Sequence, residues 1–188
     1  MSALPTVIVL AAGKGERFKA AGGSEDKLNA PLGSQRVRDH VMVAVQASGL
    51  PCHVVEREHT QHLTNPGMGD SIACGVSATP DAQGWLILPA DLPLIQASTL
   101  RAVAEALQSH TVVVPFYLGK QGHPVGFQAS CGSALKQLTG DQGARTVVAQ
   151  HAFLKLQVND EGAVLDVDTP ELLAQARSKM CPSPLQRV

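Results

Sequence analysis

Short apolar runs alternate with longer amphipathic segments between residues 6 and 115. The apolar runs are rich in β-branched residues and lack polar alternation, which is typical of strands buried on both faces of a parallel sheet. Strands are expected at 6–10, 52–56, 85–88 and 111–115. The segments between them repeat apolar residues at helical spacing. Helices are expected at 37–47, 70–77 and 98–107, the last with Ser98 as its N-cap.

This alternation predicts βαβ units, hence an α/β fold with a parallel sheet and helices on both faces. The pattern after residue 115 is less regular. Strands are expected at 125–128, 153–158 and 163–167, and helices at 133–138, 144–151 and 170–179. Residues 1–180 are therefore expected to form a single domain, followed by a loose tail at 181–188 that contains two prolines.

Composition narrows the class of protein. The AVILMFWYC set makes up 44% of the 188 residues, enough for a proper core, while the net charge is only -1 and aromatic residues are 3%. Duplex DNA or an anionic membrane requires a basic surplus, and single-stranded nucleic acid requires aromatic platforms, so we expect neither kind of partner. No apolar run approaches the ~20 residues that cross a bilayer.

The cysteines and the N-terminus favour a cytoplasmic protein. Cys52, Cys74, Cys131 and Cys181 form no CxxC pair, so we expect ordinary reduced thiols rather than a zinc or redox site. The N-terminus has no basic segment and no cleavage signal of a signal peptide.

A glycine-rich loop, LAAGKGERF at 10–18, directly follows the first expected strand. Its small residues let backbone N–H groups approach an anion, and Lys14 and Arg17 add positive charge, so the loop suits a polyphosphate. It lacks the GxxxxGKS/T pattern of a P-loop, and Phe18 stands where a GxGxxG dinucleotide fingerprint has its third glycine. An ordinary glycine-rich turn between strand and helix is the alternative.

Two further loops carry candidate binding residues. DKLNAPLG at 26–33 offers Lys27, although a lone loop lysine is usually just solvated. In NPGMGDSIACG at 65–75, Gly67 and Gly69 precede an expected helix. Ser71 either caps that helix or holds a hydroxyl or phosphate group.

Carboxylates mark two other segments. Asp91 in LPADLPL (88–94) follows a buried strand, where α/β sheets bind their ligands, and a carboxylate there is a good ligand for a hard metal ion. A capping or loop aspartate is the alternative. Asp166 and Asp168 lie in LDVDTPEL (165–172). We take them to point in opposite directions from a strand end, so we expect only one, preferably Asp168, to face Asp91, and the other to cap the last helix.

Taken in order, these segments resemble the nucleotidyltransferases of molybdenum cofactor biosynthesis, which include cytidylyltransferases and molybdopterin-guanine dinucleotide enzymes. The family is similar in architecture to GT-A glycosyltransferases, which implies a Rossmann-like three-layer α/β/α domain with a mostly parallel sheet. The segments are LAAGKGERF (10–18), DKL (26–28), GMGDSIACG (67–75), LPADLPLI (88–95), GHPVGF (122–127), GDQGAR (140–145) and DVDTPEL (166–172).

The resemblance implies transfer of a nucleoside monophosphate to the terminal phosphate of molybdopterin or molybdenum cofactor, with release of pyrophosphate. The Ala11-Ala12-Gly13 form resembles that of pyrimidine-nucleotide users and favours CTP. Transfer from GTP, or to a sugar phosphate or another phosphorylated metabolite, stays open. The resemblance also implies transient contact with a molybdoenzyme or its chaperone.

The resemblance and the charge of the reactants assign roles to individual residues. Lys27, Arg17 and Asp91 are the expected catalytic residues. Mg²⁺, with Mn²⁺ as a substitute, would be held by Asp91 and Asp168, with Asp166 in reserve. His123, Asp141 and Arg145 would line the pterin side. The nucleotide-binding residues would be Leu10, Ala11, Ala12, Gly13, Lys14, Gly15, Arg17, Lys27, Gly69 and Ser71.

Two other classes of protein fit the sequence less well. An NAD(P)-dependent oxidoreductase would carry an acidic residue about 20 residues past the glycines, whereas Glu56 follows Gly15 at about twice that distance. A non-catalytic nucleotide-binding module would not require Asp91 to hold a metal ion.

Overall fold

A seven-stranded sheet forms the middle layer of the computed structural model, which describes residues 4–23 and 26–180. Its strands are β1 (Thr6–Leu10), β4 (Cys52–Val55), β5 (Gly84–Pro89), β6 (Val112–Tyr117), β7 (Lys120–Gln121), β8 (Val125–Gln128) and β9 (Phe153–Gln157). The order is β4–β1–β5–β8–β6, and β6 also pairs with β7 and β9. β4, β1 and β5 run parallel, as do β6 and β9, whereas β8 and β7 are antiparallel to their neighbours. The expected α/β fold with a mostly parallel sheet is confirmed.

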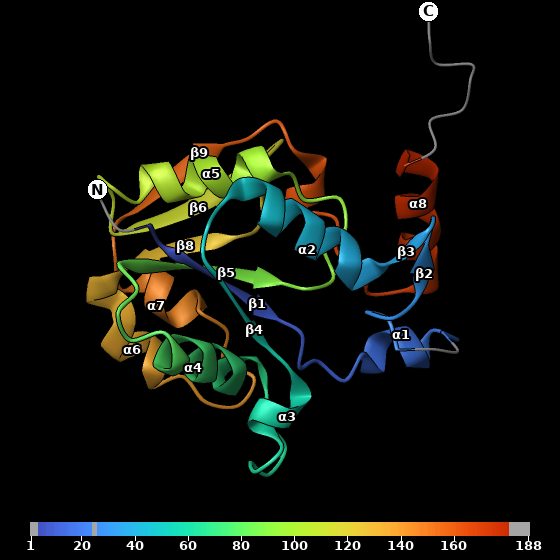
Figure 1. Cartoon of the computed structure of the whole chain (residues 1–188), viewed down its shortest axis with the longest axis horizontal. Coiled ribbons are helices and arrows are strands. Elements are labelled where there is room, and N and C mark those ends of the chain that lie inside the picture. Colours follow the sequence, from blue (N-terminus) through green and yellow to red (C-terminus); the bar gives the residue numbers. More distant parts are fainter. Residues whose placement is uncertain (1–3, 24–25, 181–188) are drawn as a thin grey trace, which may run out of the picture.

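Helices cover both faces of this sheet. On one face lie α2 (Val37–Ser48) and α5 (Ala97–Ala106); on the other lie α4 (Met68–Ala78), α6 (Gly132–Lys136) and α7 (Arg145–Ala149), as Figure 1 shows. Alternate β1 side chains enter the two cores. Val7 and Val9 pack with the α2 and α5 side, and Ile8 packs with the α4 side. The run is continuously apolar because both its faces are buried.

A third, smaller core joins segments from opposite ends of the sequence. It is formed by α1 (Glu16–Ala20), the hairpin of β2 (Pro31–Leu32) and β3 (Gln35–Arg36), and α8 (Pro170–Met180), which lie together at one side of the molecule in Figure 1. Its buried side chains include Phe18, Leu32, Val37, Val167 and Leu173. This packing brings the loop after β1 next to the segment that precedes α8.

The expected strand at 163–167 is wrong. Residues Glu161–Ala163 form a short 3-10 helix, η2, and no strand follows before α8 in this described stretch. The cause is Asp160, which is 2% exposed and whose carboxylate accepts hydrogen bonds from the backbone N–H of Gly162 and from Gln96 and Thr99 of another segment. These hydrogen bonds hold the chain in a turn, so its backbone does not pair with a neighbouring strand.

Asp160 also accounts for a second correction. The N-cap of α5 is Gln96, not Ser98, and its backbone N–H donates to Asp160 Oδ2 at 3.0 Å. The cap is thus supplied by a residue 64 positions away, which no local sequence pattern reveals. Two short helices, α1 and α3 (Arg57–Thr60), were also not expected from periodicity, because neither reaches two full turns.

The carboxyl ends of β1, β4 and β5 meet at one edge of the sheet. Leu10 pairs with Val55 on one side and Pro89 on the other, and the Ala90 N–H continues the contact to Leu10 O at 3.1 Å. The loops that follow these strands therefore converge. Within the described residues, no helix has the length and apolar character needed to cross a membrane. The tail expected at 181–188 lies outside them.

Candidate active site

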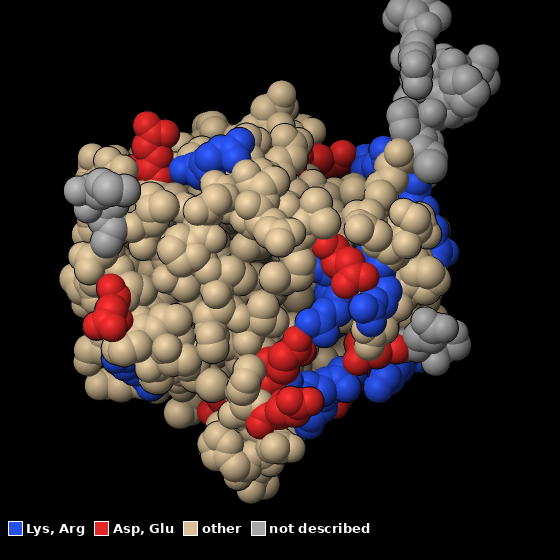
Figure 2. All heavy atoms as spheres, in the orientation of Figure 1, with Lys and Arg blue, Asp and Glu red and all other residues tan. Residues whose placement is uncertain are grey.

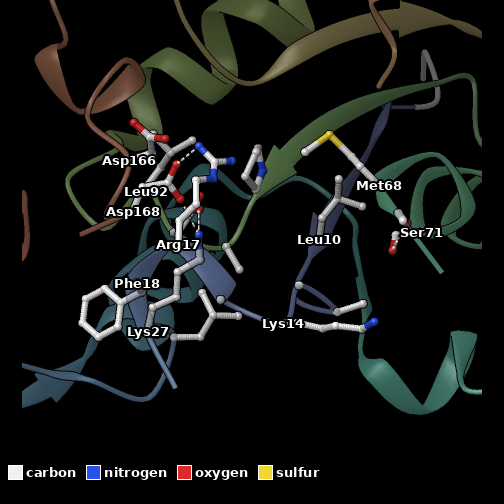
Figure 3. Close-up of a pocket in the computed structure, with 18 of the residues that line it drawn as sticks. Leu10, Lys14, Arg17, Phe18, Lys27, Met68, Ser71, Leu92, Asp166 and Asp168 are labelled. Atoms are coloured by element: carbon white, nitrogen blue, oxygen red, sulfur yellow. Dashed lines mark hydrogen bonds and ion pairs between the residues drawn. The ribbon is translucent and has the colours of Figure 1, made fainter. Parts of the chain in front are cut away.

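A cavity of about 630 Å³ opens where these loops converge (Figure 3). Its wall comes from the loop after β1, the start of α4, the loop after β5, and the segments around residues 121–123, 141 and 163–168. Most of the residues that the sequence singled out lie here. These are Leu10, Ala12, Gly13, Lys14, Gly15, Arg17, Lys27, Ser71, Asp91, His123, Asp141, Asp166 and Asp168.

Three carboxylates form a cluster at one end of the cavity. Asp91, Asp166 and Asp168 each contribute an oxygen atom, and these atoms all lie within 4.8 Å of one another. The expectation that only one of Asp166 and Asp168 faces Asp91 is therefore wrong. Residues two apart in an extended segment share a side, and here the intervening Val167 is fully buried while its N–H donates to Asp91 O at 2.8 Å. The last helix is capped instead by Thr169, which accepts from Leu172 N.

Lys27 supplies the positive charge between two of these carboxylates. Its Nζ lies 2.6 Å from Asp91 Oδ2 and 2.7 Å from Asp168 Oδ1. The three side chains are only 13%, 14% and 12% exposed, so these pairs are poorly screened by water. Arg17 reaches the other oxygen of Asp168 at 2.5 Å from a guanidinium that is 83% exposed. Figure 3 shows the Arg17, Lys27 and Asp168 side chains pointing toward one another.

The pKa values of the cluster reflect this balance. Burial alone would lower the pKa of Lys27, but attraction to Asp91 and hydrogen bonds to Asp168 and Asp91 outweigh it and raise the pKa. Burial would raise the pKa of Asp168, but Lys27 and Arg17 hold it below its usual range. Asp166 has no such partner, and burial together with the Asp168 and Asp91 carboxylates raises its pKa. Lys27 is thus held charged beside Asp91 and an ionised Asp168.

The cluster fits a divalent cation. Asp91 Oδ1 is buried and accepts no hydrogen bond from the part of the chain that the structure describes, so one acceptor of the cluster is left unsatisfied there. The atoms that could ligate a metal ion are all carboxylate oxygens, which Mg²⁺ and Mn²⁺ prefer as ligands. A cation bound between Asp91 and Asp168 would compete with the Lys27 ammonium for the same oxygens.

Arg57 and Asn65, for which the sequence suggested no role, form hydrogen bonds with the glycine-rich loop. Arg57 Nη2 donates to Gly13 O at 2.7 Å and to Asp26 Oδ2 at 2.6 Å. Lys14 Nζ donates to Asn65 Oδ1 at 2.9 Å. Charged residues of both signs gather over this side of the molecule in Figure 2. Asn65 begins the 65–75 segment that the sequence singled out, but its contact with Lys14, like those of Arg57, is long-range and has no local signal.

The other end of the cavity is less charged. Leu10, Met68 and Ser71 lie together there, away from Asp166 and Asp168 (Figure 3). Ser71 sits inside α4, and its hydroxyl donates to Gly67 O at 3.1 Å. This end of the cavity therefore offers the apolar side chains of Leu10 and Met68 with the Ser71 hydroxyl beside them.

Two of the three residues predicted to line the pterin side lie in the cavity wall. His123 and Asp141 line the cavity, but Arg145 is exposed at the start of α7 and is not part of the wall. Burial lowers the pKa of His123 despite the raising effect of Asp91, which favours a neutral imidazole, and its Nδ1 is buried without a partner. Two predicted nucleotide residues also lie outside the wall: Ala11 is buried in the core and Gly69 packs against Thr139 and Gln142.

Comparison with known proteins places this geometry in a family context. The family described as the MobA-like NTP transferase domain matches residues 7–156. The purine catabolism protein PucB of Bacillus subtilis (strain 168) is 29% identical over 202 residues, covering 92% of this chain and 96% of PucB.

Solved structures share the fold at low identity. Rv0371c from Mycobacterium tuberculosis H37Rv superposes with a TM-score of 0.78 at 22% identity, covering 95% of this chain and 99% of Rv0371c. A complex of Rv0371C with manganese gives a TM-score of 0.71 at 21% identity over 93% and 98% of the two chains. Molybdopterin-guanine dinucleotide biosynthesis protein A from Archaeoglobus fulgidus gives 0.69 at 14% identity over 93% and 98%.

The position of Lys27 yields a prediction about metal affinity. Replacing Lys27 by Met removes the ammonium that competes for the Asp91 and Asp168 oxygens, so Mn²⁺ should bind the nucleotide-free protein about 10-fold more tightly, the order of one charge-assisted hydrogen bond. Titration followed by electron paramagnetic resonance measures this affinity. Lys14→Met is the matched control, because Lys14 lines the same cavity but bonds to Asn65. Equal or weaker Mn²⁺ binding by Lys27→Met would contradict the shared-site interpretation.

Proposed function

The chain belongs to the MobA-like NTP transferase family, and from that premise we propose that it moves CMP from CTP to the terminal phosphate of molybdopterin or molybdenum cofactor, releasing pyrophosphate. Membership makes it an enzyme of the nucleotidyltransferase type with a nucleoside triphosphate as substrate. The choice of CTP rests on the Ala11-Ala12-Gly13 form of the loop. The choice of a pterin acceptor is supported by the likeness to the Archaeoglobus protein.

The observation that carries the proposal is the meeting of a phosphate-type loop and a carboxylate cluster in one cavity. Without a further cation the cavity would repel a triphosphate, since carboxylates outnumber ammonium and guanidinium groups among the described residues of its wall. The carboxylates are Glu16, Asp91, Asp141, Asp166 and Asp168, and the cations are Lys14, Arg17 and Lys27. A divalent ion held by the cluster would correct this imbalance.

The phosphate end of the nucleotide fits the loop after β1. The backbone of Gly13–Gly15 would approach the β- and γ-phosphates closely, and the ammonium of Lys14 adds charge from the same loop. Arg17, exposed at the rim and paired with Asp168, is free to turn its guanidinium toward the pyrophosphate as negative charge develops there. Lys27 would lie against the α-phosphate, where the bond to the acceptor oxygen forms and the bond to pyrophosphate breaks.

Asp91 and Asp168, joined by Asp166, would hold Mg²⁺ or Mn²⁺. When bound, the ion neutralises phosphate oxygens and raises the electrophilicity of the α-phosphorus. The acceptor phosphate is itself the nucleophile, so no side chain has to form a covalent intermediate. The protein's contribution is to align two anionic groups and to compensate their charge.

His123 and Asp141 would contact the acceptor. Both line the cavity, and a neutral His123 can donate or accept a hydrogen bond. Arg145 remains a prediction that depends on its side chain reaching the mouth of the cavity from α7. The likeness to a molybdopterin-guanine dinucleotide protein favours guanylyl transfer from GTP as the second candidate.

Nucleotide preference separates these two candidates. With reduced molybdenum cofactor as the common acceptor, kcat/KM should be highest for CTP among CTP, GTP and ATP, because the 11–13 segment has the form of pyrimidine users. Pyrophosphate release in the presence of Mg²⁺ measures the rate. A clear preference for GTP would refute cytidylyl transfer and support the guanylyl candidate.

The carboxylate cluster provides the mechanistic test. Asp91→Asn and Asp168→Asn should each lower kcat by at least ~10²-fold, the effect of removing one group that stabilises transition-state charge. Asp166→Asn should also lower kcat, because its carboxylate lies in the same group. Activity is measured across a Mg²⁺ titration, with circular dichroism as the folding control.

Asp81→Asn is the matched control for this series, because Asp81 is exposed in a turn away from the cavity wall. It should behave like the wild type. Folded Asp91→Asn protein with wild-type activity would exclude the proposed metal site and the mechanism built on it.

A further inference from the structure

Asp70 joins two loops that are far apart in sequence. It is the third residue of α4, and its Oδ2 atom accepts the backbone N–H of Gly67 at 2.8 Å and that of Gly140, also at 2.8 Å. The first bond caps the helix, as an acidic residue at this position commonly does. The second bond reaches a loop 70 residues away. One carboxylate oxygen thus binds both loops.

The two loops are in direct backbone contact at this point. Gly69 N–H donates to Gly140 O at 2.8 Å. A Cβ atom at Gly67 would lie 2.3 Å from the Gly140 carbonyl, and one at Gly69 would lie 2.6 Å from Gln142 O. Because the second loop has no regular secondary structure around Gly140, its position depends on these contacts.

The paired loops form part of the cavity wall. Pro66, Gly67 and Met68 line the cavity from the first loop, and Asp141 lines it from the second, directly after Gly140. Met68 lies with Leu10 at the end away from the acidic cluster (Figure 3). Asp70 itself is not part of the wall. Its influence on a ligand would therefore pass through the loops that it joins.

We propose that Asp70 is a positioning residue that holds residues 66–69 against residues 139–142 and thereby sets the affinity for the nucleoside triphosphate. The inference rests on the proposed function for the identity of the ligand. Asn65 also lines the cavity and binds Lys14 of the phosphate loop, so the first loop is in contact with the segment expected to hold the phosphates. Asp70 takes no part in the chemical step, because it lies outside the cavity.

The chain offers a matched control for Asp70. Asp39 is the third residue of α2, and its Oδ2 accepts the N–H of Arg36 at 3.1 Å, the same capping bond. Its carboxylate binds Arg36 alone, with no second loop, and it does not line the cavity. Comparing Asp70→Ala with Asp39→Ala therefore separates the loss of a helix cap from the loss of the bridge.

Three measurements follow on the full chain. In Asp70→Ala, affinity for CTP with Mg²⁺, measured by calorimetry, should fall about 10-fold, the order of one lost charge-assisted hydrogen bond. The KM for CTP should rise by the same factor while kcat stays within about 3-fold. Amide hydrogen exchange of residues 139–142 should become faster. In Asp39→Ala, all three quantities should match the wild type.

The conservative variant distinguishes geometry from general destabilisation. Asp70→Asn keeps an oxygen acceptor of the same shape, so it should recover CTP affinity to within about 3-fold of the wild type. If Asp70→Ala does not fold, Gly69→Ala carries the same test. Its Cβ would push residues 139–142 away while leaving the carboxylate in place, and affinity should again fall.

Unchanged CTP affinity and unchanged exchange in folded Asp70→Ala would overturn the inference. So would an equal loss in Asp39→Ala, or a fall in kcat with an unchanged KM. Failure of the proposed function has a different signature. In that case the wild-type protein binds no nucleoside triphosphate, whereas the exchange comparison still decides whether Asp70 joins the loops.

Discussion

The site depends on holding carboxylates close together where little water screens their repulsion. Asp91 and Asp168 lie close enough to share one ammonium group, and Asp166 adds a third carboxylate to the same cluster. Such an arrangement is unfavourable unless a cation offsets it. In this structure Lys27 does so, and Arg17 assists from the rim. The same electrostatic demand makes the cluster a natural place for a divalent ion, which explains why metal and lysine are expected to compete for it.

The fold satisfies this demand by assembling four segments at one edge of the sheet. Asp91 is fixed by the end of β5, and its carbonyl oxygen holds Val167, which places Asp166 and Asp168 on the side facing it. The third core, in which Phe18 packs with residues near both termini of the domain, brings the glycine-rich loop alongside. Asp160 orders the turn before this segment by binding α5. The chemistry therefore sits on elements that are each anchored by buried apolar packing.

The sequence predicted the parts of this arrangement that leave local signals. The buried strands and amphipathic helices were expected because apolar periodicity marks them, and Asp91 because a carboxylate follows a buried strand. Lys27 and Asp168 received their expected roles from the family resemblance and the charge of the reactants. Asp166 was misplaced because it was expected to point away from Asp168, whereas residues two apart in an extended segment share a side. No role was expected for Arg57, Asn65 or Asp70, although the last two lie in the 65–75 segment that the sequence singled out. They act on backbone or side-chain atoms of distant loops, and nothing in their immediate surroundings indicates those partners.

On the proposed mechanism, the cluster of Asp91, Asp166 and Asp168 serves both a divalent ion and the α-phosphate end of a nucleotide. The direct measurement is a crystal structure of the wild-type protein with Mn²⁺ and a non-hydrolysable CTP analogue, using the anomalous signal of manganese to locate the ion. We predict a peak at roughly 2.0–2.3 Å from oxygens of Asp91 and Asp168, by analogy with small divalent ions, with Lys27 Nζ moved from those carboxylates to the α-phosphate. An ion bound elsewhere in the cavity, with Lys27 still bridging Asp91 and Asp168, would contradict the claim.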